Sequence, residues 1–291
     1  MSSNEKNKCK PTANKKHLKI SKYASETADD SGVGFQDFIN SSEARLELVR
    51  AMNLMDDTFF AAVMEDTEAC TYVLRVITGI KSLVVRSCKV QYHIRNLTAH
   101  SVTLDVIAED DDGRIYNIEV QKSDNDYHPK RIRYYQANVD VTFLKKGRCY
   151  QTLPESYFIF ISSFDPFELN DNYYEIERRI KGYGDAVSNG VHEIYLNTKV
   201  VNNREVSELL QYFKNTDADS DKFGALSDKV RFYKNDKKGG RIMCDKVQRL
   251  IDESNEERDR IIEEQRIALE NAKAEVEELK ARLSKYESVE A

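Results

Sequence analysis

The segment that most constrains the fold runs from Thr103 to Gln121, because apolar and polar residues alternate along it on both sides of a turn. Asp111-Asp112-Gly113 lies at its middle, and this composition is typical of a β-hairpin turn. Side chains along a strand point alternately to the two faces of a sheet. We therefore predict two antiparallel strands, Val102–Glu109 and Arg114–Lys122, each with one apolar and one polar face.

The register of the two strands follows from burial. Both apolar faces must lie on the same side of the sheet, since a one-residue slip would move every side chain to the opposite face. This requires Val106 to face Ile118 and Leu104 to face Val120, all on one side of the sheet. Asp105 then lies directly opposite Glu119, with Cβ atoms about 5 Å apart. Two partly buried carboxylates this close repel each other, which raises one pKa unless a cation lies between them.

Mg²⁺ suits such a pair, because it prefers oxygen ligands and keeps water or phosphate as further ligands. The same alternation also fits a hairpin with one solvated face, on which acids and amides are ordinary residues. The following predicted helix, Lys130–Lys145, places Gln136 on the same stripe as Ile132 and Val139. A polar residue on a packing stripe needs a hydrogen-bond partner, either the carboxylate pair or another core group.

The other predicted elements make an α/β sandwich around a mixed central sheet. We predict helices at Ser42–Met52, Asp57–Ile77 and Glu205–Lys214, and strands at Leu83–Tyr92, Tyr157–Ser162 and Val191–Asn197. Asp66 is expected to cap the second helix again midway, and Gly79 is expected to follow its last turn.

The 291 residues divide into three predicted parts. Residues 1–34 are rich in lysine and poor in apolar residues, so we predict a disordered tail, either solvated or acting as a basic arm on nucleic acid. Residues 35–240 hold the aromatic and β-branched residues of the folded domain. Residues 241–291 are predicted to form a coiled-coil helix, and Lys237–Arg241 a flexible hinge before it.

Apolar residues recur with heptad spacing in this last part: Ile262, Leu269, Val276 and Leu283, with Ala272, Leu279 and Tyr286 between them. A lone helix with a solvated surface would be marginal, so we predict a homo-oligomer. Charged residues make up 32% of the chain, above the usual value of about 25%, and they are concentrated here.

Composition excludes several classes of protein. No apolar run approaches the ~20 residues of a membrane span, and no secretory signal is recognisable. The five cysteines form no C-x-x-C pair, which favours a reduced, cytoplasmic protein without a zinc ribbon. The net charge of -6 argues against passive coating of nucleic acid but not against local DNA contacts. Lys130-Arg-Ile-Arg133 is either such a contact or an exposed helix start.

The motifs around the hairpin resemble those of a known family. Asp105 followed by Glu119-x-Gln121 resembles the PD-(D/E)XK nuclease motif, with Gln in place of the usual Lys. Further matches are Asp57-Thr-Phe-Phe60, Asp110–Asp112 with Gly113-Arg114, Asn117-Ile-Glu-Val-Gln121, Arg133-Tyr-Tyr-Gln136, Lys146-Gly147 and Tyr157-Phe-Ile-Phe-Ile161. Together, over roughly residues 50 to 215, they resemble the PD-(D/E)XK nuclease family transposases, also called recombination-promoting nucleases.

This resemblance implies a restriction-endonuclease-like fold and a metal-dependent DNA endonuclease using Mg²⁺ or Mn²⁺. Asp105 and Glu119 match the metal-binding acids, and Asp57 matches an acidic position on the first core helix, with Asp56 as the alternative. Gln121 matches the usual catalytic Lys, and Gln136 a polar position on the following helix.

The glutamine at position 121 opens an alternative function. A lysine can stabilise an attacking hydroxide or the phosphate charge, whereas a neutral glutamine can only orient a water or a phosphate oxygen. Lys122 is adjacent, but its side chain is expected on the other face of the strand. The alternative is therefore a weak or inactive DNA-binding or assembly module that retains the nuclease fold.

Overall fold

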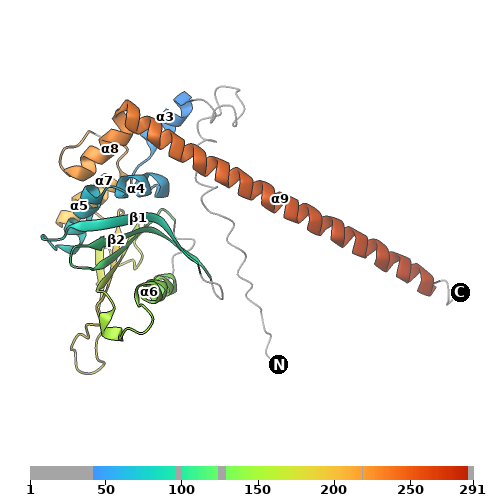
Figure 1. Ribbon diagram of the computed structural model, residues 1–291, viewed down its shortest axis with the longest axis horizontal. Helices are drawn as coiled ribbons and strands as arrows, with labels where there is room; N and C mark the ends of the chain where they lie inside the picture. Colours follow the sequence, from blue (N-terminus) through green and yellow to red (C-terminus); the bar gives the residue numbers. More distant parts are fainter. Residues whose placement is uncertain (1–41, 96–99, 124–128, 218, 288–291) are drawn as a thin grey trace. The chain divides into compact units, whose positions relative to one another are not determined.

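The computed structural model describes residues 42–95, 100–123, 129–217 and 219–287 (Figure 1). Ser42–Cys244 forms one compact unit, and the chain from Asp245 onward belongs to a second. The predicted tail at residues 1–34 lies outside the described residues. None of the described helices has both the length and the apolar character that crossing a membrane requires.

A six-stranded mixed sheet forms the centre of the first unit, in the order β1-β2-β3-β4-β6-β5. Its strands are β1 (Val85–Ile94), β2 (Val102–Asp110), β3 (Ile115–Gln121), β4 (Ser156–Ser162), β5 (Tyr173–Ile176) and β6 (Val191–Asn197). β1, β2 and β3 pair antiparallel, whereas β3, β4 and β6 run parallel. The predicted α/β class with a mixed sheet is confirmed.

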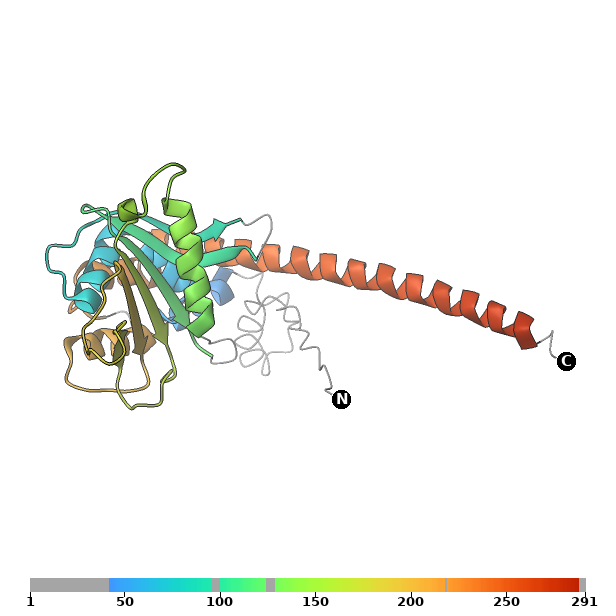
Figure 2. The same ribbon diagram turned by 90° about the horizontal axis from the view of Figure 1, so that it is seen from below.

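Helices cover both faces of this sheet (Figures 1 and 2). α4 (Asp57–Met64) contacts β1, β2 and β3 on one face, α5 (Thr67–Thr78) contacts β1, and α6 (Pro129–Phe143) contacts β2 on the other. The predicted break between α4 and α5 is confirmed, because the Asp66 carboxylate accepts hydrogen bonds from the Glu68 and Ala69 amides. Gly79 follows α5 with φ of 72°, a left-handed conformation that glycine adopts without a Cβ penalty.

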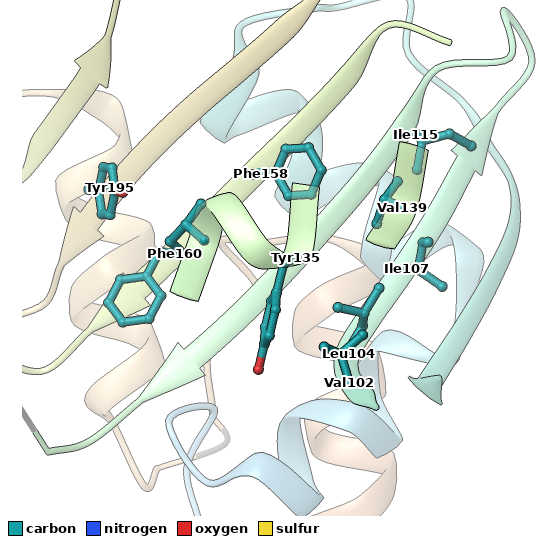
Figure 3. Close-up of a cluster of buried hydrophobic side chains, with 10 residues drawn as sticks. Val102, Leu104, Ile107, Ile115, Tyr135, Val139, Phe158, Phe160 and Tyr195 are labelled. Carbon is teal, nitrogen blue, oxygen red and sulfur yellow. The ribbon is translucent and has the colours of Figure 1, made fainter. Parts of the chain in front are cut away.

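Each face of the sheet has its own core. Phe59, Phe60 and Val63 of α4 are fully buried, as are Val106 and Ile118 of the sheet. The cluster beneath α6 comprises Val102, Leu104, Ile107, Ile115, Ile132, Tyr135, Val139, Phe158, Phe160 and Tyr195 (Figure 3). The two cores hold the β2–β3 pair between them, so both faces of the hairpin are covered.

One expected side-chain placement is wrong. Regular alternation would put Leu104 with Val106, but Leu104 packs in the α6 cluster with Ile107 (Figure 3). The β2–β3 ladder is regular only where Val106–Glu109 face Ile115–Ile118. The strand therefore departs from simple alternation at the intervening residue, Asp105.

Several elements could not be seen in the sequence. The strand β5 has only four residues, half of them exposed, so it shows little alternation. α8 (Ala225–Asn235) is rich in charge, yet its apolar side chains Leu226 and Val230 are buried. α3 (Ser42–Ala51) and α7 (Glu205–Lys214) lie where they were predicted.

The predicted hinge at Lys237–Arg241 is wrong, because α9 is one continuous helix over Lys237–Glu287. Asp236 caps it, and its carboxylate accepts hydrogen bonds from the Lys238 amide at 2.8 Å and the Gly239 amide at 3.0 Å. A Cβ at Gly239 would lie 1.9 Å from the Phe232 carbonyl oxygen. The glycine thus allows α8 and α9 to approach closely rather than to flex. Association of α9 with a second copy stays a prediction.

Candidate active site

Asp105 and Glu119 meet where the β2–β3 ladder ends. The Asp105 amide donates to Glu119 Oε1 at 3.2 Å, and the Val120 amide donates to Asp105 Oδ2 at 3.2 Å. The two carboxylates therefore accept hydrogen bonds from each other's strand, beyond the last pair, Val106 with Ile118. The predicted register is confirmed in bringing these two acids together.

The carboxylate of Glu119 is buried, with 3% of the residue exposed. Asn117 Nδ2 donates to its Oε1 at 2.9 Å and to the Val106 carbonyl at 3.2 Å, which fixes the side chain against β2. Oε2 accepts no hydrogen bond from any residue that the structure describes. Burial, and then the charge of Asp105, raise the pKa of Glu119 well above its ordinary value. The site is therefore short of positive charge.

Asp105 lies against an irregular part of the neighbouring strand. Gln91 Nε2 donates to Asp105 Oδ1 at 3.3 Å. Gln91 has φ of 49°, a left-handed conformation that residues other than glycine seldom adopt. It falls between the pairs Val90–Val106 and Tyr92–Leu104, which keep one register, so the irregular backbone of β1 is local to Gln91. Strained backbone of this kind is found preferentially at functional sites.

The Gln121 amide is held on both sides. Its Oε1 accepts from Arg131 Nη1 at 3.1 Å, and its Nε2 donates to the Ser123 carbonyl at 2.8 Å. Arg131 also donates through Nε to the Tyr135 hydroxyl at 2.9 Å, and its guanidinium lies 5.2 Å from the centre of that ring. Its Nη2 is 3.8 Å from Glu119 Oε2. Sequence reasoning noted Arg131 only within a basic run and did not assign it to this site.

The hydrogen-bond partner of Gln136 is not the Asp105–Glu119 carboxylate pair. It is buried, and its Nε2 donates to Glu193 Oε2 at 3.0 Å. Tyr195 donates its hydroxyl hydrogen to the other oxygen of Glu193. The carboxylate that binds Gln136 therefore belongs to Glu193 of β6 and not to Asp105 or Glu119. Of the two predicted kinds of partner, the structure has another core group.

Asp57 is the first residue of α4, and Asp56 precedes the helix as its N-cap. Lys122 forms an ion pair with Asp56, so its side chain reaches α4, as expected for the face opposite Gln121. Within the described ranges, no group of three or more His, Cys, Asp or Glu side chains is arranged to hold a metal. Asp57 is therefore not gathered with Asp105 and Glu119, and its role as a third ligand stays a prediction.

The residues present fit a divalent cation in one respect: Glu119 Oε2 is a buried carboxylate oxygen without a hydrogen bond, beside a second carboxylate. Two carboxylates with water or phosphate as further ligands are a common arrangement for Mg²⁺. Asn117 and Gln91 also belong to this site, although the sequence alone did not assign them to it. Asn117 could have been found because it shares a strand face with Glu119, whereas Gln91 carries no signal in the sequence.

Comparison with known proteins identifies a family. The model of the family described as PD-(D/E)XK nuclease family transposase matches residues 85–282 of the chain. The matched range includes Asp105, Glu119, Gln121 and Gln136 but not Asp57. Neither the curated proteins nor the solved structures give a significant match.

Proposed function

This chain belongs to the PD-(D/E)XK nuclease family transposases, and from that membership we propose that it is a divalent-metal-dependent endonuclease that hydrolyses DNA phosphodiester bonds. The observation that carries the proposal is the buried Glu119 carboxylate, which lies beside Asp105 with one oxygen left without a hydrogen bond among the described residues. A fold seldom retains two adjacent acids with an unsatisfied buried oxygen unless a cation or a proton completes them.

Asp105 and Glu119 are the proposed metal ligands, with Mg²⁺ as the ion and Mn²⁺ as a substitute. The bound ion would supply Lewis-acid chemistry, lowering the pKa of an attacking water and polarising the phosphodiester. Asn117 and Gln91 hold the two carboxylates in place through the hydrogen bonds described above. Asp57, the first residue of α4, is proposed as a further ligand on the basis of the family resemblance alone.

Gln121 is proposed to orient a water or a phosphate oxygen. Its amide is fixed by Arg131 and by the Ser123 carbonyl, so it can present a constant geometry to a ligand. Gln136 is proposed to act less directly, by holding α6 against β6 through Glu193. Neither glutamine can carry the positive charge of the lysine that the motif usually contains.

We also propose that α9 associates with a second copy of the chain and so brings two active sites to one duplex. Four apolar residues at heptad positions remain about half exposed in the single chain: Ile262 55%, Leu269 56%, Val276 48% and Leu279 54%. A row of this kind along one helix is the surface that a coiled coil buries.

The test is a plasmid-nicking assay with Mg²⁺ or Mn²⁺, comparing the parent with Asp105→Ala and Glu119→Ala. The proposal predicts metal-dependent cleavage that is lost in both variants. Cleavage that persists in both would come from another site or a contaminant. The glutamine at position 121 favours a second candidate, a DNA-binding module without activity. Duplex binding with no cleavage by the parent under any metal would support that candidate.

A further inference from the structure

We propose that Arg131 supplies the positive charge that the motif usually places at position 121, and that it binds the scissile phosphate. The inference rests on the proposed nuclease function and deepens it. In this chain the positive charge would come from a residue of α6 rather than of β3. It would still lie beside Gln121 and Glu119.

The position of Arg131 is fixed by contacts on three sides. Nη1 donates to Gln121 Oε1 at 3.1 Å, Nε donates to the Tyr135 hydroxyl at 2.9 Å, and the guanidinium lies over the Tyr135 ring. Tyr135 itself is buried in the α6 cluster. Burial and the charge of Glu119 raise the pKa of Tyr135 to about 12, so its hydroxyl stays protonated as a neutral acceptor for Arg131.

One end of the guanidinium remains available for a ligand. Nη2 lies 3.8 Å from Glu119 Oε2, which is too long for a hydrogen bond. The Arg131 side chain is 34% exposed, whereas that of Glu119 is 4% exposed. The charge is thus held by the protein on one side and open to solvent on the other, which suits a residue that meets a substrate.

The chemistry of arginine allows Arg131 to take the place of the lysine that the motif usually contains. Arginine presents a planar fork of donors that matches two oxygens of a phosphate, and it remains charged when partly buried. Lys122, the basic residue next to Gln121 in the chain, is committed to Asp56 on the opposite side of the sheet. In this assignment Gln121 orients Arg131, because its side-chain carbonyl oxygen accepts a hydrogen bond from the guanidinium.

A charge-relocation experiment tests this assignment. Three proteins are compared with the parent: Arg131→Gln, the double variant Arg131→Gln with Gln121→Lys, and the control Arg86→Gln. Arg86 is an exposed residue on β1 paired with Glu109, so its variant loses the same charge away from the site. Three quantities are measured: the plasmid-nicking rate with Mg²⁺, the affinity for a short labelled duplex with Ca²⁺, and the affinity for Mn²⁺ by titration calorimetry. Circular dichroism melts establish that each variant is folded.

The assignment predicts different results for the three measurements. Arg131→Gln should lower the nicking rate about 100-fold or more, the usual effect of removing one donor aimed at transition-state charge. Its duplex affinity should fall further than that of Arg86→Gln. Its Mn²⁺ affinity should be unchanged or higher, because a cation near the ligand Glu119 has been removed. The double variant should regain at least about tenfold in nicking rate, since the charge returns on a neighbouring side chain.

Two results would overturn the assignment. The first is a nicking rate for Arg131→Gln within about threefold of the parent. The second is a loss of rate together with a loss of Mn²⁺ affinity and no recovery in the double variant, which would make Arg131 a positioning residue for Glu119. If the parent binds duplex but never nicks it, the nuclease proposal fails by itself. Duplex affinities of Arg131→Gln and Arg86→Gln then decide the Arg131 contact, and equal affinities would refute it.

Discussion

Replacing Glu119 with glutamine should make the metal-free protein more stable. The substitution keeps an acceptor oxygen for the Asp105 amide and Asn117 Nδ2 while removing a buried charge. If the Glu119 carboxylate contributed to folding, removing its charge would lower the free energy of unfolding. A rise in that free energy would have the opposite meaning. It would show that the carboxylate is present for a reason other than folding.

The magnitude follows from three contributions. Repulsion between the Asp105 and Glu119 carboxylates, at a separation of about 5 Å, is about 3 kcal/mol at an effective dielectric constant of about 20. The attraction of Arg131 across 3.8 Å is of similar size, about 4 kcal/mol before solvent screening of its partly exposed guanidinium. These two nearly cancel. What remains is the buried Oε2 without a hydrogen bond, which costs about 1–3 kcal/mol.

The assay is thermal unfolding at pH 7.5 in the presence of a chelator, where Glu119→Gln should melt about 2–12 °C above the parent. Glu109→Gln is the matched control on the neighbouring strand β2, because its carboxylate is 32% exposed and paired with Arg86. That control should change the free energy of unfolding by less than about 1 kcal/mol. Mn²⁺ at about 100 times its Kd should stabilise the parent by about 2.7 kcal/mol and Glu119→Gln far less.

The gain should also depend on pH. Burial raises the pKa of Glu119 in the folded state above the unfolded value near 4.5, so the folded protein holds a proton that the unfolded chain has released. The parent therefore loses stability as pH rises from about 4.5 through the folded pKa, whereas Glu119→Gln does not. The two proteins should differ little below pH 4.5 and most at neutral pH. A variant that melts at or below the parent at pH 7.5 would refute the claim that the buried Glu119 carboxylate weakens the metal-free fold.

Three further predictions concern the scaffold. Asp66→Ala should lower the free energy of unfolding by about 1 kcal/mol in denaturant titration, since the cap of α5 is lost, whereas Asp66→Asn should retain most of it; equal losses would assign the effect to the Lys229 ion pair instead. Gly239→Ala should destabilise by more than about 1 kcal/mol, because its Cβ would lie 1.9 Å from the Phe232 carbonyl oxygen. Gly240→Ala in the same helix supplies the comparison for glycine removal, because its Cβ would meet the end of the Leu46 side chain at 3.2 Å and no backbone atom closer than 3.6 Å. Leu269→Glu with Val276→Glu should reduce the mass in light scattering without changing the melting of the nuclease unit, and an unchanged mass would disprove association through α9.

The sequence predicted those parts of the site that depend on local pattern. Alternation around Asp111-Asp112-Gly113 was enough to pair the two strands and to bring Asp105 to Glu119, because burial permits one register only. Helical periodicity located α6 and predicted that Gln136 is buried. It could not choose between carboxylates as the partner of Gln136, since Glu193 comes from a distant strand.

The remaining features arise from contacts that have no local pattern. The positive φ of Gln91 is local to that residue, and nothing about a glutamine between apolar neighbours announces it. Arg131 lies at the start of a helix among other basic residues, and only the packed position of Tyr135 turns it toward Gln121. The glycines at 239 and 240 suggested flexibility, whereas the close approach of Phe232 makes one of them a packing requirement.

The interrupted ladder at Asp105 has a consequence for how such a protein changes over generations. If the acid pair weakens the fold, many substitutions at Asp105 or Glu119 raise stability while abolishing activity. A gene no longer under selection for activity would then accumulate substitutions that inactivate the protein and raise its stability, and none of these substitutions would cause misfolding. Both acids are still in place in this chain, with Asn117 and Gln91 holding them.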